Sequence, residues 1–280
     1  MSLGEKERCL WNRYRTDTPT ISAALEELNP MTEWVLETTN LSKEFKGFLA
    51  VSEVDIQVRK GDIHALIGPN GAGKTTVFNL LTKFITPTSG RILYKGEDIT
   101  NEKPADIALR GIIRSFQISA VFPNLTPFEN VRVALQRRLG ISYHFWKPKS
   151  SLDVLTVKVM ELLTAVGLHE LAHRPTIELA YGQKRALEIA TTLALEPEML
   201  LLDEPTQGMG AEDVERITEL VRRVAADRTI LMVEHNLKVV AKLADRITVL
   251  NRGVVLAEGD YDEISQNSEV MEAYMGSEDA

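Results

Sequence analysis

The chain has 280 residues, of which 44% are hydrophobic and 26% are charged, and its formal net charge is −8 at pH 7. We expect a globular protein with one substantial core, or one core with a smaller lobe. The composition excludes a membrane-spanning helix, since no apolar run approaches about eighteen residues, and the acidic balance argues against a nucleic-acid surface. With a single cysteine, Cys9, and no signal-peptide pattern at the N-terminus, the sequence favours the cytoplasm.

The predicted elements begin after an N-terminal extension. Residues 1–33 have little periodicity, and we expect them to be loosely ordered. From Trp34 onward, short β-type runs are separated by turn residues. The predicted strands in this part of the chain are 34–36, 51–58, 63–67 and 91–94.

A phosphate-binding pattern, G-x-x-x-x-G-K-[ST], directly follows the predicted strand 63–67 and precedes a helix-like stretch. Its glycines let backbone N–H groups turn toward an anion, and the helix adds the positive end of its dipole. We expect Lys74 to reach the β- and γ-phosphates and Thr75 to ligate Mg²⁺. A tight turn with a solvated lysine is the alternative, which the surrounding strand and helix disfavour. The predicted nucleotide-binding residues are Gly68, Pro69, Asn70, Gly71, Ala72, Gly73, Lys74, Thr75 and Thr76.

The middle of the chain is mostly helical, and strands and helices alternate after it. Alternation of this kind predicts crossover units and a parallel sheet covered on both faces. The predicted helices are 104–110, 127–139, 152–166, 183–195, 211–225 and 236–244. The predicted later strands are 199–202, 229–233, 246–250 and 254–258.

Polar residues follow two of these strands at their carboxyl ends, where a parallel sheet forms its crevice. Asp203 and Glu204 end the run 199–202, and His235 follows the run 229–233. We expect Asp203 to hold Mg²⁺ through water and Glu204 to accept a proton from the water that attacks the γ-phosphate. The alternatives are two solvated acids at a strand end and a structural histidine.

These motifs together resemble the ATPase subunit of ATP-binding-cassette (ABC) transporters over residues 34–276. The phosphate loop, Gln117, a signature at 179–183, the acids and His235 stand in the family's order. The resemblance implies an α/β fold, with a RecA-like P-loop NTPase core, an N-terminal antiparallel β subdomain, an inserted α-helical subdomain at about 118–190, and a tail at 277–280. It also implies that Gln117 contacts Mg²⁺ and the attacking water, and that His235 contacts the γ-phosphate.

The same resemblance places Phe45 against the adenine ring, which suits an aromatic face. An ordinary core phenylalanine is the alternative for this residue. The signature, which reaches across a dimer to the other subunit's nucleotide, corresponds to Leu179, Ala180, Tyr181, Gly182 and Gln183.

The signature departs from the family at one position. The family usually has a serine where this chain has Ala180, and that hydroxyl hydrogen-bonds the γ-phosphate. Losing one hydrogen bond to a charged group should weaken closure by about 1.5–3 kcal/mol. We therefore hypothesise that this signature serves a less active site on the partner.

Several segments are similar in sequence to the branched-chain amino-acid import group, most of all to its larger ATPase subunit. They include 125–131, 203–209, 233–236 and 274–276. This implies ATP and Mg²⁺ as cofactors, and a peripheral location on the cytoplasmic face of the inner membrane. The implied partners are a second ATPase subunit, in a homo- or heterodimer, two membrane permeases and, indirectly, a periplasmic solute-binding protein. The implied activity is ATP hydrolysis coupled to uptake of a small polar solute, with urea, short amides or lipopolysaccharide as alternative cargo.

Three other interpretations stay open. His169, Glu170 and His173 fit the zinc-protease pattern H-E-x-x-H, but Gly167 and Pro175 leave little room for the continuous helix it requires. An ABC ATPase acting on DNA or the ribosome is disfavoured by a single phosphate loop, the absence of sustained heptads and the acidic balance. A binder that holds ATP without cleaving it is disfavoured by Glu204.

Overall fold

The computed structural model of the chain describes residues 34–115, 121–138 and 155–275. The chain divides into two units, Met1–Glu33 and Trp34–Ala280, and all of the description below concerns the second unit. The predicted extension 1–33, the tail 277–280 and Gln117 lie outside the described residues.

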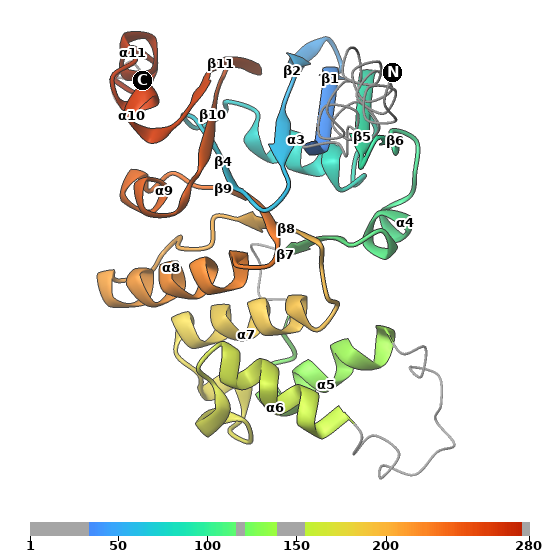
Figure 1. The fold of residues 1–280 in the computed structure, drawn as a ribbon, viewed down its shortest axis with the longest axis vertical. Helices are drawn as coiled ribbons and strands as arrows, with labels where there is room; N and C mark the ends of the chain where they lie inside the picture. The colour runs from blue at the N-terminus through green and yellow to red at the C-terminus, as the bar shows by residue number, and fades with distance from the viewer. Residues whose placement is uncertain (1–33, 116–120, 139–154, 276–280) are drawn as a thin grey trace, which may run out of the picture. The chain divides into compact units, whose positions relative to one another are not determined.

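One sheet has six strands in the order β11-β10-β4-β9-β8-β7 (Figure 1). All neighbouring pairs from β7 to β10 are parallel, and β11 pairs with β10 in the antiparallel direction. The order differs from the chain order because helices connect strands that are not adjacent, which confirms the predicted parallel sheet. The bounds are β4 (Ile63–Ile67), β7 (Ile112–Ser115), β8 (Met199–Asp203), β9 (Thr229–Val233), β10 (Arg246–Asn251) and β11 (Val254–Gly259).

Alternate residues of the parallel strands pack on opposite faces of this sheet. In β4, Ala65 and Ile67 join a core with residues of α7, α8 and α9, whereas Leu66 joins a second core with α3 and the antiparallel strands. Strand geometry requires this alternation, since successive side chains point to opposite faces. Both faces are therefore covered, as the sequence predicts. The bounds are α3 (Lys74–Leu81), α4 (Pro104–Leu109), α7 (Tyr181–Leu193), α8 (Ala211–Ala225) and α9 (Leu237–Leu243).

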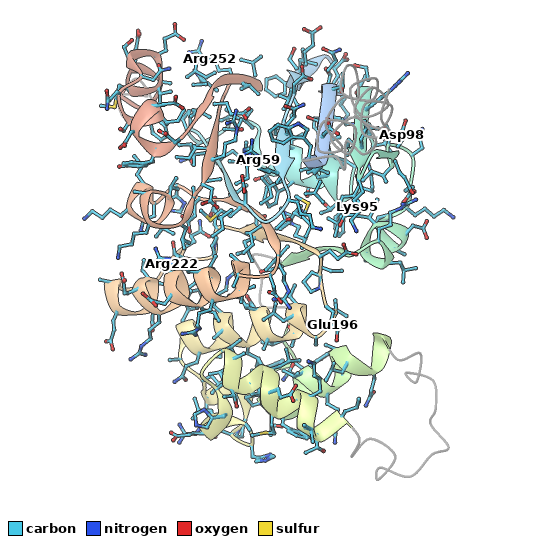
Figure 2. All side chains as sticks on the ribbon, in the orientation of Figure 1. Arg59, Lys95, Asp98, Glu196, Arg222 and Arg252 are labelled. Atoms are coloured by element: carbon cyan, nitrogen blue, oxygen red, sulfur yellow. The ribbon has the colours of Figure 1, made fainter. Side chains whose placement is uncertain are left out.

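The last strand of the sheet, β11, is connected to β10 by a hairpin and not by a crossover. Arg252 and Gly253, with φ of 48° and 82°, form the two-residue turn between β10 and β11, and Arg252 is labelled there in Figure 2. Positive φ at both central residues is the geometry of a tight hairpin, which glycine favours. The simple alternation of strands and helices that the sequence suggests therefore ends at β10.

A second sheet is antiparallel and contains β1 (Trp34–Phe45), β2 (Phe48–Val54), β3 (Gln57–Arg59), β5 (Ser89–Tyr94) and β6 (Glu97–Asp98). The predicted strand 34–36 was too short, because pairing with three other strands extends β1 through polar residues that show no clear alternation. The predicted strand 51–58 was wrong as one element, since its two halves pair with different ends of β1. This sheet is the predicted antiparallel subdomain.

Between β7 and β8, the elements that the structure describes are helices. Helices α5 (Pro127–Arg138), α6 (Thr156–Ala165) and α7 contact one another and lie side by side (Figure 1). α5 begins with a capping box, in which the Thr126 N–H donates to Glu129 Oε2 and the Glu129 N–H donates to Thr126 Oγ1. The C-terminal helices are α10 (Tyr261–Ser265) and α11 (Ser268–Met275). Across the residues that the structure describes, no helix has the length and apolar character needed to cross a membrane.

Candidate nucleotide site

The phosphate loop connects β4 to α3, and two of its glycines are required by close backbone contacts. Gly68 has φ of 147°, and a Cβ there would lie 2.1 Å from the carbonyl oxygen of Leu250. Gly73, the residue before α3, has φ of 102°, and a Cβ there would lie 2.8 Å from the carbonyl oxygen of Ala50. The loop can take this path only with glycine at both positions.

Lys74 is the first residue of α3, and its side chain turns back along the loop. Its Nζ donates to the carbonyl oxygens of Gly68, at 2.7 Å, and Pro69, at 3.0 Å. Burial lowers the pKa of Lys74, while the nearby charges of Glu204 and Asp203 act in the opposite direction. The cationic head thus lies within the electrostatic reach of both predicted acids, where it can bind phosphate oxygens.

The acids and the predicted histidine follow neighbouring strands at one edge of the sheet. Asp203, the last residue of β8, is in register with Val233, the last residue of β9, and Val233 is also in register with Leu66 of β4. The three strands run in the same direction, so their following residues share one edge. The structure therefore brings the phosphate loop, Glu204 and His235 to the same side of the sheet.

Glu204 has a left-handed backbone conformation, which Glu53 and Glu196 share. Its φ is 45°, and its N–H donates to the carbonyl oxygen of Val233 at 2.9 Å. A left-handed conformation in a non-glycine residue costs about 1–3 kcal/mol, so surrounding contacts must hold it. The hydrogen bond to the end of β9 fixes the backbone from which the Glu204 side chain projects.

Asp203 makes a buried ion pair that sequence analysis missed. Arg114 of β7 donates from one terminal nitrogen to Asp203 Oδ2, at 2.5 Å, and from the other to Asn79 Oδ1, at 2.7 Å. The side chains of Arg114 and Asp203 are 9% and 3% exposed. The only sequence signal for this contact is a charged residue after two isoleucines in the segment 112–115, which is a strand that the sequence did not predict.

The predicted signature lies at the start of α7, which is anchored to the same strand. Arg185, in the second turn of α7, donates to the carbonyl oxygen of Asp203 at 2.8 Å and to Glu188 at 2.7 Å. Ala180 is exposed, and its N–H donates to Gln183 Oε1 at 3.0 Å. Gly182 packs so closely against α8 that a Cβ there would lie 2.7 Å from Asp213 Cγ.

Three more of the predicted residues are exposed, and one lies outside the described part. Thr75 and His235 are exposed, in the first turn of α3 and after β9. Phe45, at the end of β1, is 43% exposed with Lys43 Nζ 5.1 Å from its ring centre, so the alternative of an ordinary core phenylalanine is wrong. Gln117 lies outside the described residues, and its predicted role stays a prediction.

The C-terminal helix α11 also reaches the phosphate loop. Burial raises the pKa of Tyr274 to about 12, while the backbone of Gly68 acts in the opposite direction, which places this hydroxyl near the loop. No local pattern around Tyr274 indicates a role at the loop.

The zinc-protease interpretation fails on geometry. His169–Leu171 forms a single 3₁₀ turn and not a continuous helix, and the His173 ring packs on Phe128 at 5.4 Å between ring centres. The pattern needs two histidines on one helical face. Among the residues described, no group of three or more His, Cys, Asp or Glu side chains could hold a metal ion.

Comparison with known families assigns the class of protein. Residues 51–207 match the family model described as "ABC transporter". This match covers more than half of the chain. The chain therefore belongs to the ABC transporter family as an ATP-binding subunit, and it is an ATPase. A second model, described as "Branched-chain amino acid ATP-binding cassette transporter", matches residues 254–280.

Two curated relatives narrow the similarity within that family. The chain is 37% identical, over 254 residues, to the high-affinity branched-chain amino acid transport ATP-binding protein BraF of Pseudomonas aeruginosa, covering 88% of this chain and 99% of that protein. It is 38% identical, over 257 residues and with the same coverage, to the protein LivG of Escherichia coli K12, which has the same description.

A solved structure agrees with the fold. The crystal structure of the ADP conformation of an ATP-binding cassette of an ABC transporter superposes with a TM-score of 0.77 at 30% identity, covering 88% of this chain and 100% of that one. A nucleotide-free cassette superposes with a TM-score of 0.75 at 30% identity, covering 86% and 98%.

Proposed function

We propose that this chain is the ATP-hydrolysing subunit of an importer of branched-chain amino acids. The observation that carries the ATPase part is the convergence of Lys74, Asp203, Glu204 and His235 at one edge of the parallel sheet. The cargo assignment rests on similarity, since both relatives named above are branched-chain amino acid transport proteins that match nearly their full length.

Within this proposal, the phosphate loop binds the triphosphate. Its backbone N–H groups, the start of α3 and the Lys74 ammonium provide the positive groups for the phosphates. Phe45, exposed at the end of β1, offers a ring face for adenine. Glu204 orients the attacking water and accepts its proton, and His235 contacts the γ-phosphate from the end of β9.

The oxygen donors at the site fit Mg²⁺. Thr75 presents an exposed hydroxyl at the start of α3, and Asp203, whose buried carboxylate pairs with Arg114, ends β8 at the same edge of the sheet. Mg²⁺ is usually held by one or two protein oxygens together with substrate phosphates and water, so a site without a cage of acidic side chains suits it. Bound there, Mg²⁺ would neutralise charge on the β- and γ-phosphates. Gln117 is proposed to contact it as well.

The proposal includes partners that the chain needs for transport. A second ATPase subunit would face the signature at the start of α7, where Ala180 and Tyr181 are exposed. Two permeases would hold both subunits at the cytoplasmic face of the membrane. ATP binding would favour the closed pair, and hydrolysis would reopen it, since a ligand shifts an equilibrium only through its differential affinity for the two states.

The variant Glu204→Gln tests the catalytic assignment. It should retain ATP binding, because the Lys74 loop is unchanged, and should release almost no phosphate, because an amide cannot accept the proton. Binding is measured by titration with a fluorescent ATP analogue and turnover by phosphate release. Substantial turnover would place the base elsewhere, and loss of binding in wild type would refute the nucleotide site itself.

The cargo is tested with the permeases that co-purify with the chain from native membranes. In proteoliposomes holding this complex, ATP should drive uptake of labelled leucine, isoleucine and valine, and Glu204→Gln should abolish it. Uptake of urea or short amides in place of these amino acids would refute the cargo assignment and leave the ATPase assignment intact.

A further inference from the structure

Glu234 is a buried acid between the last residue of β9 and His235, and it is hydrogen-bonded on both carboxylate oxygens. Oε1 accepts from the N–H of Thr206, at 3.1 Å, and from its Oγ1, at 2.6 Å. Oε2 accepts from the N–H groups of His235, at 3.0 Å, and Asn236, at 3.1 Å. The residue has 0% exposed surface.

These four bonds connect two loops that follow different strands. Thr206 lies two residues after Glu204, in the loop after β8, whereas His235 and Asn236 form the loop between β9 and α9. Asn236 also caps α9, because its side chain accepts from the N–H of Lys238. The planar carboxylate of Glu234 therefore sets the distance between the loop that contains Glu204 and the loop that contains His235.

A carboxylate is the side chain that suits this position. All four partners act as donors, and a carboxylate has two oxygens that only accept, with room for about four bonds. An amide of the same shape has one accepting oxygen and one donating nitrogen. Glutamine could thus satisfy one loop only, and its nitrogen would face the donors of the other loop.

We propose that Glu234 is a positioning residue for ATP hydrolysis, which holds the Glu204 loop and the His235 loop in one arrangement. The inference rests on the roles proposed above for Glu204 and His235. It predicts that the hydrolysis step depends on Glu234 while ATP binding does not, because the phosphate loop and Lys74 make none of the four bonds.

The test compares Glu234→Gln with wild type in steady-state ATP hydrolysis by the full-length chain. We expect kcat to fall by about ten- to a hundredfold, the effect of a displacement of about 1 Å in a catalytic group. The KM for ATP and the affinity for a fluorescent ATP analogue should change by less than about threefold. A residue that only stabilised the fold would lower the folded fraction and leave the kcat per folded molecule unchanged.

Two further variants address the same contact from its other side, in case Glu234→Gln folds poorly. Thr206→Val removes the hydroxyl donor with little change in shape and should lower kcat, and Thr206→Ser should recover most of the loss. The double variant Glu234→Gln with Thr206→Val should be no slower than Glu234→Gln alone, since both remove one shared interaction.

Thr218→Ala, which removes buried atoms, is the matched stability control. Thr218 is buried in α8, and its hydroxyl donates to the Val214 carbonyl oxygen at 2.7 Å. It should lower the melting temperature without changing kcat. If the wild-type chain hydrolyses ATP and neither Glu234→Gln nor Thr206→Val changes kcat, the positioning role of Glu234 is refuted and the proposed function stands. A wild-type chain that binds and hydrolyses no ATP would refute the proposed function as well.

Discussion

A buried histidine in the central sheet should make this protein less stable in mild acid. His64 lies in β4 with 0% exposed surface, and its Nε2 is 2.8 Å from Thr248 Oγ1 of the adjacent strand β10. Burial, and to a lesser extent the charge of Arg246, lower the pKa of His64 from 6.5 to about 4. We therefore predict that lowering the pH from 6.5 to about 4 lowers the free energy of unfolding.

The sign follows from the lower pKa of the folded state. As the pH falls, the unfolded chain takes up a proton at this histidine before the folded chain does, which favours unfolding. The stability that neutral His64 contributes is fully present above about pH 6.5 and is lost between about pH 6.5 and pH 4. The lowered pKa corresponds to about 3 kcal/mol in total, of which about 2 kcal/mol should be lost by pH 5.

Urea unfolding of the full chain at about pH 7.5 and about pH 5 measures this loss. His64→Asn keeps a polar side chain in β4 that does not titrate, so it should lose about 2 kcal/mol less than wild type over this range. Thr248→Val is the matched control, because it removes the hydroxyl and keeps the buried ring. It should be less stable at both pH values with the pH dependence of wild type. Equal pH dependence in wild type and His64→Asn would refute the reasoning.

Two further predictions follow from the site. Ala180→Ser should raise turnover in the assembled transporter, since it restores a hydroxyl toward the γ-phosphate that the partner subunit holds. The same serine should add about 1 kcal/mol of stability as the N-cap of α7. An unchanged turnover rate would contradict the hypothesis of a weakened signature. Arg114→Met should lower the free energy of unfolding by about 3–5 kcal/mol, because it leaves the buried Asp203 without this ion pair. Arg216→Met breaks the exposed ion pair with Glu212 and should lower the free energy of unfolding by under about 1 kcal/mol in the same urea titration. Similar losses for Arg114→Met and Arg216→Met would show that burial is not the deciding factor.

Local patterns predicted much of the architecture. The strands 63–67 and 229–233 and the helix 211–225 have the predicted bounds. The two strands are short, largely apolar runs that are buried throughout, and the helix has clear amphipathic periodicity. The phosphate loop was predictable for a similar reason: its chemistry needs glycines and a lysine that are consecutive in the chain. The order of the motifs was then enough to indicate the ABC family, which the family comparison confirmed.

Elements that depend on distant partners were harder to predict. β1 runs through polar residues that become a strand only by pairing, and β7 was missed because a short run with a charge inside it has no strand signal of its own. The turn at Arg252 and Gly253 makes a hairpin in which β11 reverses direction beside β10.

The sequence by itself determined which residues would form the phosphate loop, the acidic strand end and the histidine loop, because each is a local pattern of a few residues. Tertiary structure alone decided what holds them in place. Arg114 meets Asp203 across 89 positions of the chain, and Glu234 meets Thr206 across 28. No local propensity specifies such pairs; they exist because parallel strands bring their carboxyl ends to one edge, where buried charges must find hydrogen-bonding partners.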